Sequence, residues 1–223
     1  MQGPHLGIAT PFIKQPNPTL KHNQDWSEID LESVSRTFIP ATAYQVIHSN
    51  QMKYDLNYPK FEIKGRQLSD RQFFRIAWRR MAATTGFRTL ISGVLPPGTA
   101  VSGAAMSAFA EDRLTTVQFG AVLSTILADY VVRSSGVANI YPATIGAIPA
   151  LPTTGRIEHS LVTNYLRLNC LTEAFAPLWE ELMGKPWGVD TPLRKDEERR
   201  AAQVEIDAIV ALSLGVTADE LCM

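Results

Sequence analysis

Hydrophobic residues in the middle of the chain follow the spacing of a small sheet. Phe74, Ile76 and Trp78 occupy every second position, which places them on one face of a half-buried strand. The apolar run over 88–95 follows a Thr-Thr-Gly turn signal at 84–86 and stops at Pro-Pro-Gly, as expected for a central strand. We expect these two strands to pair as a hairpin, with a third strand over 100–109.

Helical spacing dominates the second half of the chain. Apolar positions over 114–132 predict one buried helix that is apolar nearly all round. A proline-rich crossing loop is expected over 139–152. Helix returns over 157–183 and is expected to break near Pro177.

The clearest helix signal lies near the C-terminus. Thr191 is a good N-cap, Pro192 suits the first helical position, and Gly215 ends the pattern. The apolar face of this helix is predicted to hold Ala201, Val204, Ala208, Ala211 and Leu212. Its charged residues predict a solvated face with i,i+4 ion pairs, formed by Arg194, Lys195, Asp196, Glu197, Glu198, Arg199, Arg200 and Glu205.

The sequence stops soon after another helix signal. Thr217 and Glu220 form a capping box, and only one turn follows it. This pattern predicts that the sequence is a fragment of a longer chain.

The first 60 residues contain a proline in every apolar run, which predicts an irregular arm that wraps over another body. Within this arm, the sequence predicts a short strand over 6–9. The predicted fold is therefore α+β, with a small, mainly antiparallel sheet and a buried helix. The arm is expected over 1–60, the core over 61–155 and a helical region over 156–223.

Composition indicates a globular chain without obvious membrane segments. Of the 223 residues, 45% are hydrophobic and 19% are charged, close to the averages for globular proteins. Cys170 and Cys222 lie far apart, with no histidine at ligand spacing, so neither a disulfide framework nor a zinc site is expected. A reduced, cytoplasmic location fits this pattern best, since no apolar stretch reaches membrane-span length and no signal peptide is apparent.

Charge is distributed unevenly along the chain. The net charge of −1 would be unusual for an autonomous nucleic-acid binder. Between Lys53 and Arg88, however, nine basic residues stand against three acidic ones, a local charge of +6. Any polyanionic partner is therefore expected to meet the middle of the chain.

Common catalytic signatures are absent from the sequence. It contains no glycine-rich phosphate loop, G-x-S-x-G or H-E-x-x-H, and the four histidines, His5, His22, His48 and His159, are best interpreted as surface or structural residues. Asp55, Glu62 and Lys64 have the order used by metal-dependent nucleases. The alternative is that they belong to a solvated loop, since Asp55 lacks a strand to position it.

Arginines on the expected strands are the first candidates for DNA contacts. Arg75 and Arg79 should share one sheet face, Arg80 falls on the other, and Arg88 opens the next strand. Their planar guanidinium groups suit phosphates and guanine edges. The alternative is a solvated sheet face with salt bridges, in which Glu62, Asp70 or Asp112 would be the acidic partner.

Two residues in the expected crossing loop are candidates for contacts with base edges. Asn139 could bind adenine through a bidentate pair, and Tyr141 lies beside it. The alternative is a purely structural role in the loop.

The chain as a whole resembles a known family. The relevant stretches are Gln2–Phe12, Arg75–Met81, Arg88–Gly98, Leu166–Thr172 and Pro177–Glu180. They resemble the C-terminal region of large adenine-specific DNA methyltransferases, the type IIG and phage-growth-limitation-like enzymes of bacterial restriction-modification and phage-defence systems. The similarity covers nearly all of the chain.

This resemblance implies a division of labour within a longer protein. The family's upstream domain binds S-adenosylmethionine and methylates a flipped adenine through an Asn/Asp-Pro-Pro-Tyr/Phe motif. That motif is missing here, since Asn17-Pro18-Thr19 and the segment 139–142 do not match it. The resemblance thus implies sequence-specific recognition of double-stranded DNA without catalysis. An interaction module of a defence complex, docking through the arm and the C-terminal helices without touching DNA, is the alternative.

Overall fold

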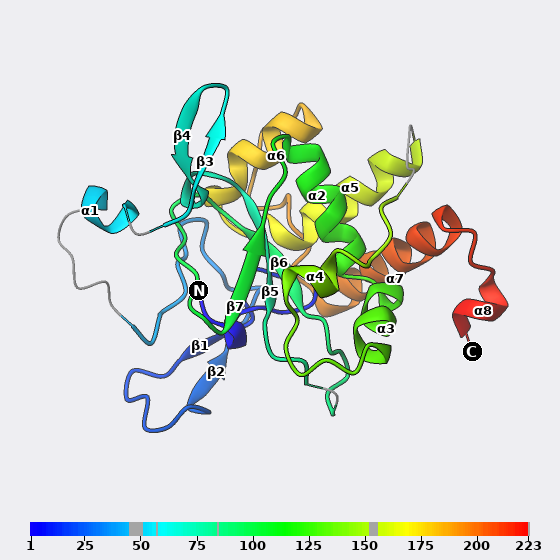
Figure 1. Cartoon of the computed structure of the whole chain (residues 1–223), viewed down its shortest axis with the longest axis horizontal. Coiled ribbons are helices and arrows are strands. Elements are labelled where there is room, and N and C mark those ends of the chain that lie inside the picture. Colours follow the sequence, from blue (N-terminus) through cyan, green and yellow to red (C-terminus); the bar gives the residue numbers. More distant parts are fainter. Residues whose placement is uncertain (45–50, 57, 84, 152–155, 223) are drawn as a thin grey trace.

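The computed structural model of the chain describes residues 1–44, 51–56, 58–83, 85–151 and 156–222 (Figure 1). His48 and Thr84 lie outside the described residues. The strands are β1 (Lys14–Pro16), β2 (Trp26–Glu28), β3 (Lys60–Ile63), β4 (Arg66–Ser69), β5 (Arg75–Arg79), β6 (Ser92–Leu95) and β7 (Ala105–Ala108). The helices are α1 (Gln51–Asp55), α2 (Arg113–Leu123), α3 (Ile126–Ser134), α4 (Pro142–Ile145), α5 (Arg156–Asn169), α6 (Ala176–Met183), α7 (Asp196–Ser213) and α8 (Ala218–Cys222), with short 3-10 helices η1 (Gly3–His5), η2 (Asp70–Gln72) and η3 (Glu173–Phe175). The fold is α+β, as the sequence predicts.

The central sheet has the strand order β6-β5-β7, and both pairings are antiparallel. Ile76 of β5 faces Val94 of β6 and Ala108 of β7. The predicted hairpin and third strand are therefore confirmed. We expected β5 to be half-buried. Instead, four of its five residues are buried, so side chains on both faces of the strand are covered.

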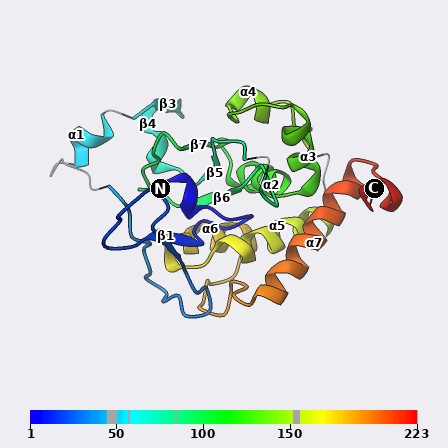
Figure 2. The same ribbon diagram turned by 90° about the horizontal axis from the view of Figure 1, so that it is seen from below.

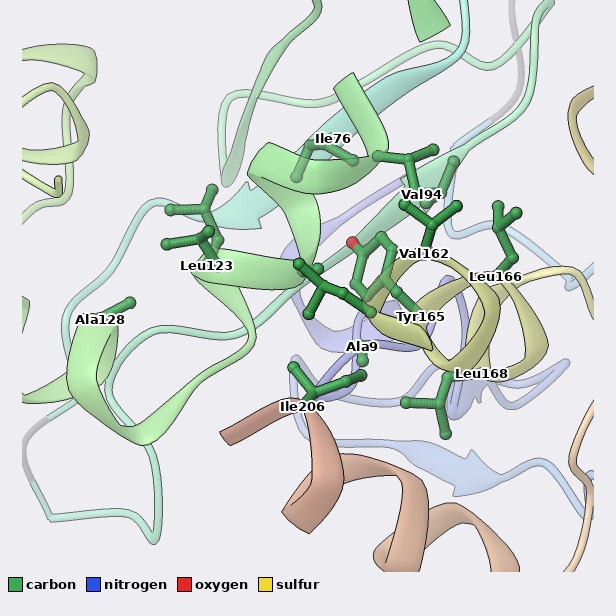
Figure 3. Packing of buried hydrophobic residues seen from close by; sticks show 14 of the residues in the cluster. Ala9, Ile76, Val94, Leu123, Ala128, Val162, Tyr165, Leu166, Leu168 and Ile206 are labelled. Atoms are coloured by element: carbon green, nitrogen blue, oxygen red, sulfur yellow. The ribbon is translucent and has the colours of Figure 1, made fainter. Parts of the chain in front are cut away.

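Helices cover one face of this sheet. Figure 3 shows Ile76 and Val94 of the sheet, Tyr165 of α5 and Ile206 of α7 gathered in one core. All four side chains are almost completely buried. Burial of this kind contributes roughly 1.5–3 kcal/mol for each large aliphatic side chain.

The N-terminal arm covers the other face. Leu6 packs against Ala77, Leu95 and Ala105, which project from the three strands. The arm can approach closely because Gly93 of β6 has no side chain, and a Cβ there would lie 2.5 Å from the carbonyl oxygen of Thr10. Both faces of β5 are therefore buried.

Two expectations about extended segments need correction. The predicted strand over 6–9 is limited to an isolated bridge between Gly7 and Thr10. The expected central strand over 88–95 begins only at Ser92 and lies at the edge of the sheet. Helix side chains take the place of a further strand there, because Val94 donates its backbone N–H to Asn169 Oδ1 at 2.9 Å.

The single helix expected over 114–132 is two helices, α2 and α3, which meet at a bend of 67°. The break follows from capping. Ser124 donates its hydroxyl to the carbonyl of Ala121, and the hydroxyl of Thr125 accepts the N–H of Ala128 to begin α3.

The helical stretch expected over 157–183 breaks slightly before the predicted site. Helix α5 ends at Asn169, and Pro177 lies in the first turn of α6, where a missing N–H has no cost.

The long C-terminal helix differs most from expectation. Helix α7 begins at Asp196, while the Thr191 hydroxyl accepts the N–H of Gly188 in the preceding loop. Its buried apolar residues are Ala202, Ile206, Val210 and Ala211, whereas Val204 and Leu212 are exposed. Of the predicted face, only Ala211 is buried.

Two arginines near this helix are also not solvated as expected. Arg199 is buried and donates to the carbonyls of Leu168 and Leu193 and to the hydroxyl of Thr10. Arg194 donates to the carbonyl oxygen of Val189 nearby and to those of Leu31, Val34 and Leu171. Both guanidinium groups join α7 and its preceding loop to segments far away in the sequence.

The last predicted helix signal is confirmed. The Thr217 hydroxyl accepts the N–H of Glu220, whose carboxylate accepts the N–H of Thr217 at 2.8 Å. Within the described part of the chain, no single helix is both long and apolar enough to cross a membrane, although α2 and α3 together pass that test as a bent pair.

Candidate nucleic-acid interface

Arg75 is part of the protein interior. Its side chain is 1% exposed and forms a salt bridge of 2.9 Å with Asp70. Asp70 is one of the three carboxylates expected as partners if these arginines form salt bridges within the protein. The same guanidinium donates to the Ser107 hydroxyl at 3.3 Å and to the carbonyl of Thr99. Desolvation lowers the pKa of Arg75, and Asp70 opposes that shift. In this arrangement Arg75 has no free surface to offer a phosphate.

Arg71 is held in a similar way at the same end of β5. It pairs with Asp55 and donates to the carbonyl of Gly98 at 2.6 Å. Its guanidinium also lies over the rings of Tyr54 and Tyr58, 4.9 and 5.3 Å from their centroids.

The nuclease hypothesis gains no support from this geometry. Asp55 pairs with Arg71, while Glu62 is exposed on β3 and Lys64 lies in the turn that follows it. Among the residues that the structure describes, no group of three acidic, histidine or cysteine side chains could hold a metal ion.

Arg79 and Arg88 come together at the opposite end of β5, where both line one hollow. Arg79 donates to the carbonyl of Leu6 in the arm and has no carboxylate partner among the described residues. Burial lowers its pKa. Arg88 pairs with Asp207 at 3.5 Å, and its Nη1 atom is buried without a hydrogen-bond partner.

Arg80, Asn139 and Tyr141 form a separate group. Met81 forms a β-bridge with Asn139, and the backbone carbonyl of Arg80 accepts the N–H of Ile140 at 2.7 Å. The side chain of Tyr141 is 51% exposed, immediately before α4. These residues therefore lie close together on a partly exposed segment.

The hairpin β3–β4 carries three basic residues that have no acidic partner among the described residues. Lys60, Lys64 and Arg66 are exposed and form no ion pair within the described parts of the chain. A two-residue turn, Lys64-Gly65, joins the strands, and both residues adopt a positive φ. Figure 1 shows this hairpin standing out from the body of the molecule.

This hairpin lies within the region expected to be irregular or without strands, and was not predicted from the sequence. The available signal was the dipeptide Lys64-Gly65 between two short runs of alternating polarity. Phe61 of β3 anchors it, since its ring meets that of Phe109 at 5.1 Å in an edge-to-face contact.

Known proteins provide no further guide to this surface. No family model, no curated protein and no solved structure matches the chain.

Proposed function

We propose that this chain binds duplex DNA as the target-recognition part of an adenine-specific DNA methyltransferase. The observation that carries the proposal is the protruding β3–β4 hairpin with its three unneutralised cations, Lys60, Lys64 and Arg66. A two-stranded ribbon fits the major groove, and cations on it can neutralise phosphates.

The proposed DNA-facing surface also includes the segment before α4. Figure 2 shows the hairpin and α4 on the same side of the molecule, away from α7. Asn139 and Tyr141, together with Arg80, remain candidates for contacts with bases. Arg75 is left out of this surface because it is buried and paired with Asp70, and Arg79 and Arg88 are left out because they line the hollow at the opposite end of β5.

The chain itself is not proposed to catalyse methyl transfer. The sequence resemblance suggests that an upstream domain of a longer, restriction-modification or phage-defence protein binds S-adenosylmethionine and transfers the methyl group. The present chain would position the DNA so that the target adenine can be flipped into that domain.

A pair of double variants tests the DNA interface. Lys60→Glu/Arg66→Glu reverses two charges on the hairpin, and Lys21→Glu/Lys185→Glu reverses two exposed charges elsewhere. Affinity for a mixed-sequence duplex is measured by fluorescence anisotropy between about 50 and 200 mM salt. We expect the hairpin variant to bind about tenfold more weakly, with a salt slope reduced by about two.

The control variant should keep the wild-type slope. Equal affinities for the two variants, or wild-type binding that does not depend on salt, would contradict the proposal. A salt-independent association with protein would instead favour the interaction module.

A further inference from the structure

A hollow of about 790 Å³ lies at the end of β5 that is remote from the β3–β4 hairpin. Its lining comes mainly from three segments, the N-terminal arm over 7–13, the connection between β5 and β6, and helix α7, with Leu31 and Ile126 also contributing. We propose that this hollow, the arm–α7 groove, binds an extended peptide segment of another protein that carries a carboxylate between apolar side chains.

The walls of the groove expose large apolar side chains. Phe87 is 90% exposed, Met81 is 69% exposed and Val204 is 60% exposed, and all three line the groove. Phenylalanine, methionine and arginine are enriched at the centres of protein interfaces. Their gathering around a concave surface indicates an apolar partner.

The groove also holds unused positive charge. Its lining contains four arginines and two aspartates, so it is positive overall. Arg79 has no carboxylate partner among the described residues, and the side chain of Arg88 is only 10% exposed with Nη1 unpartnered. An entering carboxylate would compensate these desolvated guanidinium groups through charge-assisted hydrogen bonds.

A peptide fits these features better than nucleic acid does. The apolar side chains of Phe87, Met81 and Val204 would gain little from a hydrated phosphate backbone. A short carboxylate between apolar side chains could bind both Arg79, which has no carboxylate partner among the described residues, and the exposed apolar walls.

Selection from a random peptide library displayed on phage tests this inference on the full chain. We expect the selected peptides to share an Asp or Glu next to Leu, Ile or Phe. A fluorescein-labelled peptide of that consensus should bind Phe87→Ser about tenfold more weakly than the wild type, because Phe87 is an exposed aromatic contact. Replacing the acidic residue of the peptide by its amide should weaken binding to the wild type similarly.

Tyr130→Ser provides the matched control. Tyr130 is 70% exposed on α3 but does not line the groove, so this variant should bind the peptide like the wild type. Arg79→Gln should also weaken binding. Phe87 is the primary test residue, because its exposed ring contributes little to folding.

Several results would overturn the inference. These are selection of no consensus, a consensus without an acidic residue, or unchanged binding to Phe87→Ser. Concentration-dependent self-association that Phe87→Ser abolishes would assign the groove to a second copy of the chain, and competition by a DNA duplex would assign it to nucleic acid. The hairpin variant Lys60→Glu/Arg66→Glu should keep full peptide affinity, so failure of DNA binding and failure of peptide binding are distinguishable.

Discussion

The arginines at the two ends of β5 differ in whether they have a carboxylate partner. At the end near the β3–β4 hairpin, Arg71 and Arg75 each meet a carboxylate, Asp55 and Asp70 respectively. At the other end, the side chains of Arg79 and Arg80 have no carboxylate within salt-bridge distance among the described residues. Arginines on one short stretch of sequence thus have different roles.

This difference separates arginines that stabilise the fold from arginines that can still bind a ligand. A buried guanidinium paired with a carboxylate has little electrostatic attraction left for a ligand, since its charge is already compensated. A desolvated guanidinium bound only to carbonyl oxygens keeps its charge available. The local charge of +6 over 53–88 therefore overstates what the segment can offer to any single partner.

The largest expected effect comes from removing the paired arginine. Arg75→Met should lower the free energy of unfolding by about 3–5 kcal/mol, because it leaves a partly buried Asp70 carboxylate without its partner. Arg79→Met should cost less, about 1–3 kcal/mol, because it leaves only the carbonyl of the buried Leu6 unpaired. Urea denaturation measures both. Equal losses would show that the two ends do not differ as described.

An intermediate effect is expected where the arm lies on the sheet. Gly93→Ala places a methyl group 2.5 Å from the Thr10 carbonyl oxygen, so we expect a loss of about 1–3 kcal/mol in the free energy of unfolding. Hydrogen exchange at the Ile13 N–H, which is bonded to the carbonyl of His5 at 2.7 Å, should become faster.

Gly86→Ala is the control, since its new Cβ would lie no closer than 3.4 Å to a neighbouring atom. It should change stability by no more than about 0.5 kcal/mol. A Gly93→Ala protein with unchanged exchange at Ile13 would mean that this contact does not hold the arm in place.

The smallest effect concerns Asp207, the carboxylate that faces Arg88 in the arm–α7 groove. Burial raises its pKa, while Arg88 and the N–H of Ile126 oppose the shift. The folded state therefore binds this proton more tightly than the unfolded state, and the associated stability is present at low pH and lost as pH rises above 3.8 through the raised pKa.

Comparison with Asp207→Asn isolates this carboxylate, because an amide oxygen can still accept the N–H of Ile126. Urea denaturation at about pH 4 and about pH 7 should show the wild type losing stability relative to the variant toward neutral pH. The opposite trend would indicate that the ion pair with Arg88 outweighs burial.

Local sequence patterns predicted the three strands of the central sheet, β5, β6 and β7, but not β1 to β4. The alternation at Phe74, Ile76 and Trp78 and the Pro-Pro-Gly stop after Leu95 identified the hairpin of β5 and β6, because both signals act within a few residues. They could not show that the arm also buries the second face of β5. That burial depends on Leu6 and Gly93, which are remote in the sequence.

The roles of the charged residues could not be predicted in the same way. Arg199 follows an acidic helix start and has the sequence context of a solvated residue, yet its oxygen partners include Thr10 at the far end of the chain. On α7, tertiary packing selects Ile206 and Val210 for burial, and local spacing did not distinguish them from Val204. The hairpin cations, by contrast, are exposed because Lys64-Gly65 makes a purely local turn.

The side chain of Asn169 has a consequence for how the molecule behaves in solution. Its Oδ1 atom accepts the backbone N–H of Val94 on the outer edge of β6. Similarly, Asp129 Oδ1 accepts the N–H groups of Thr89 and Leu90 just before that strand. Unprotected strand edges can recruit strands from other chains. Two helix side chains thus accept N–H groups on β6 and just before it, where a strand from another chain could otherwise pair.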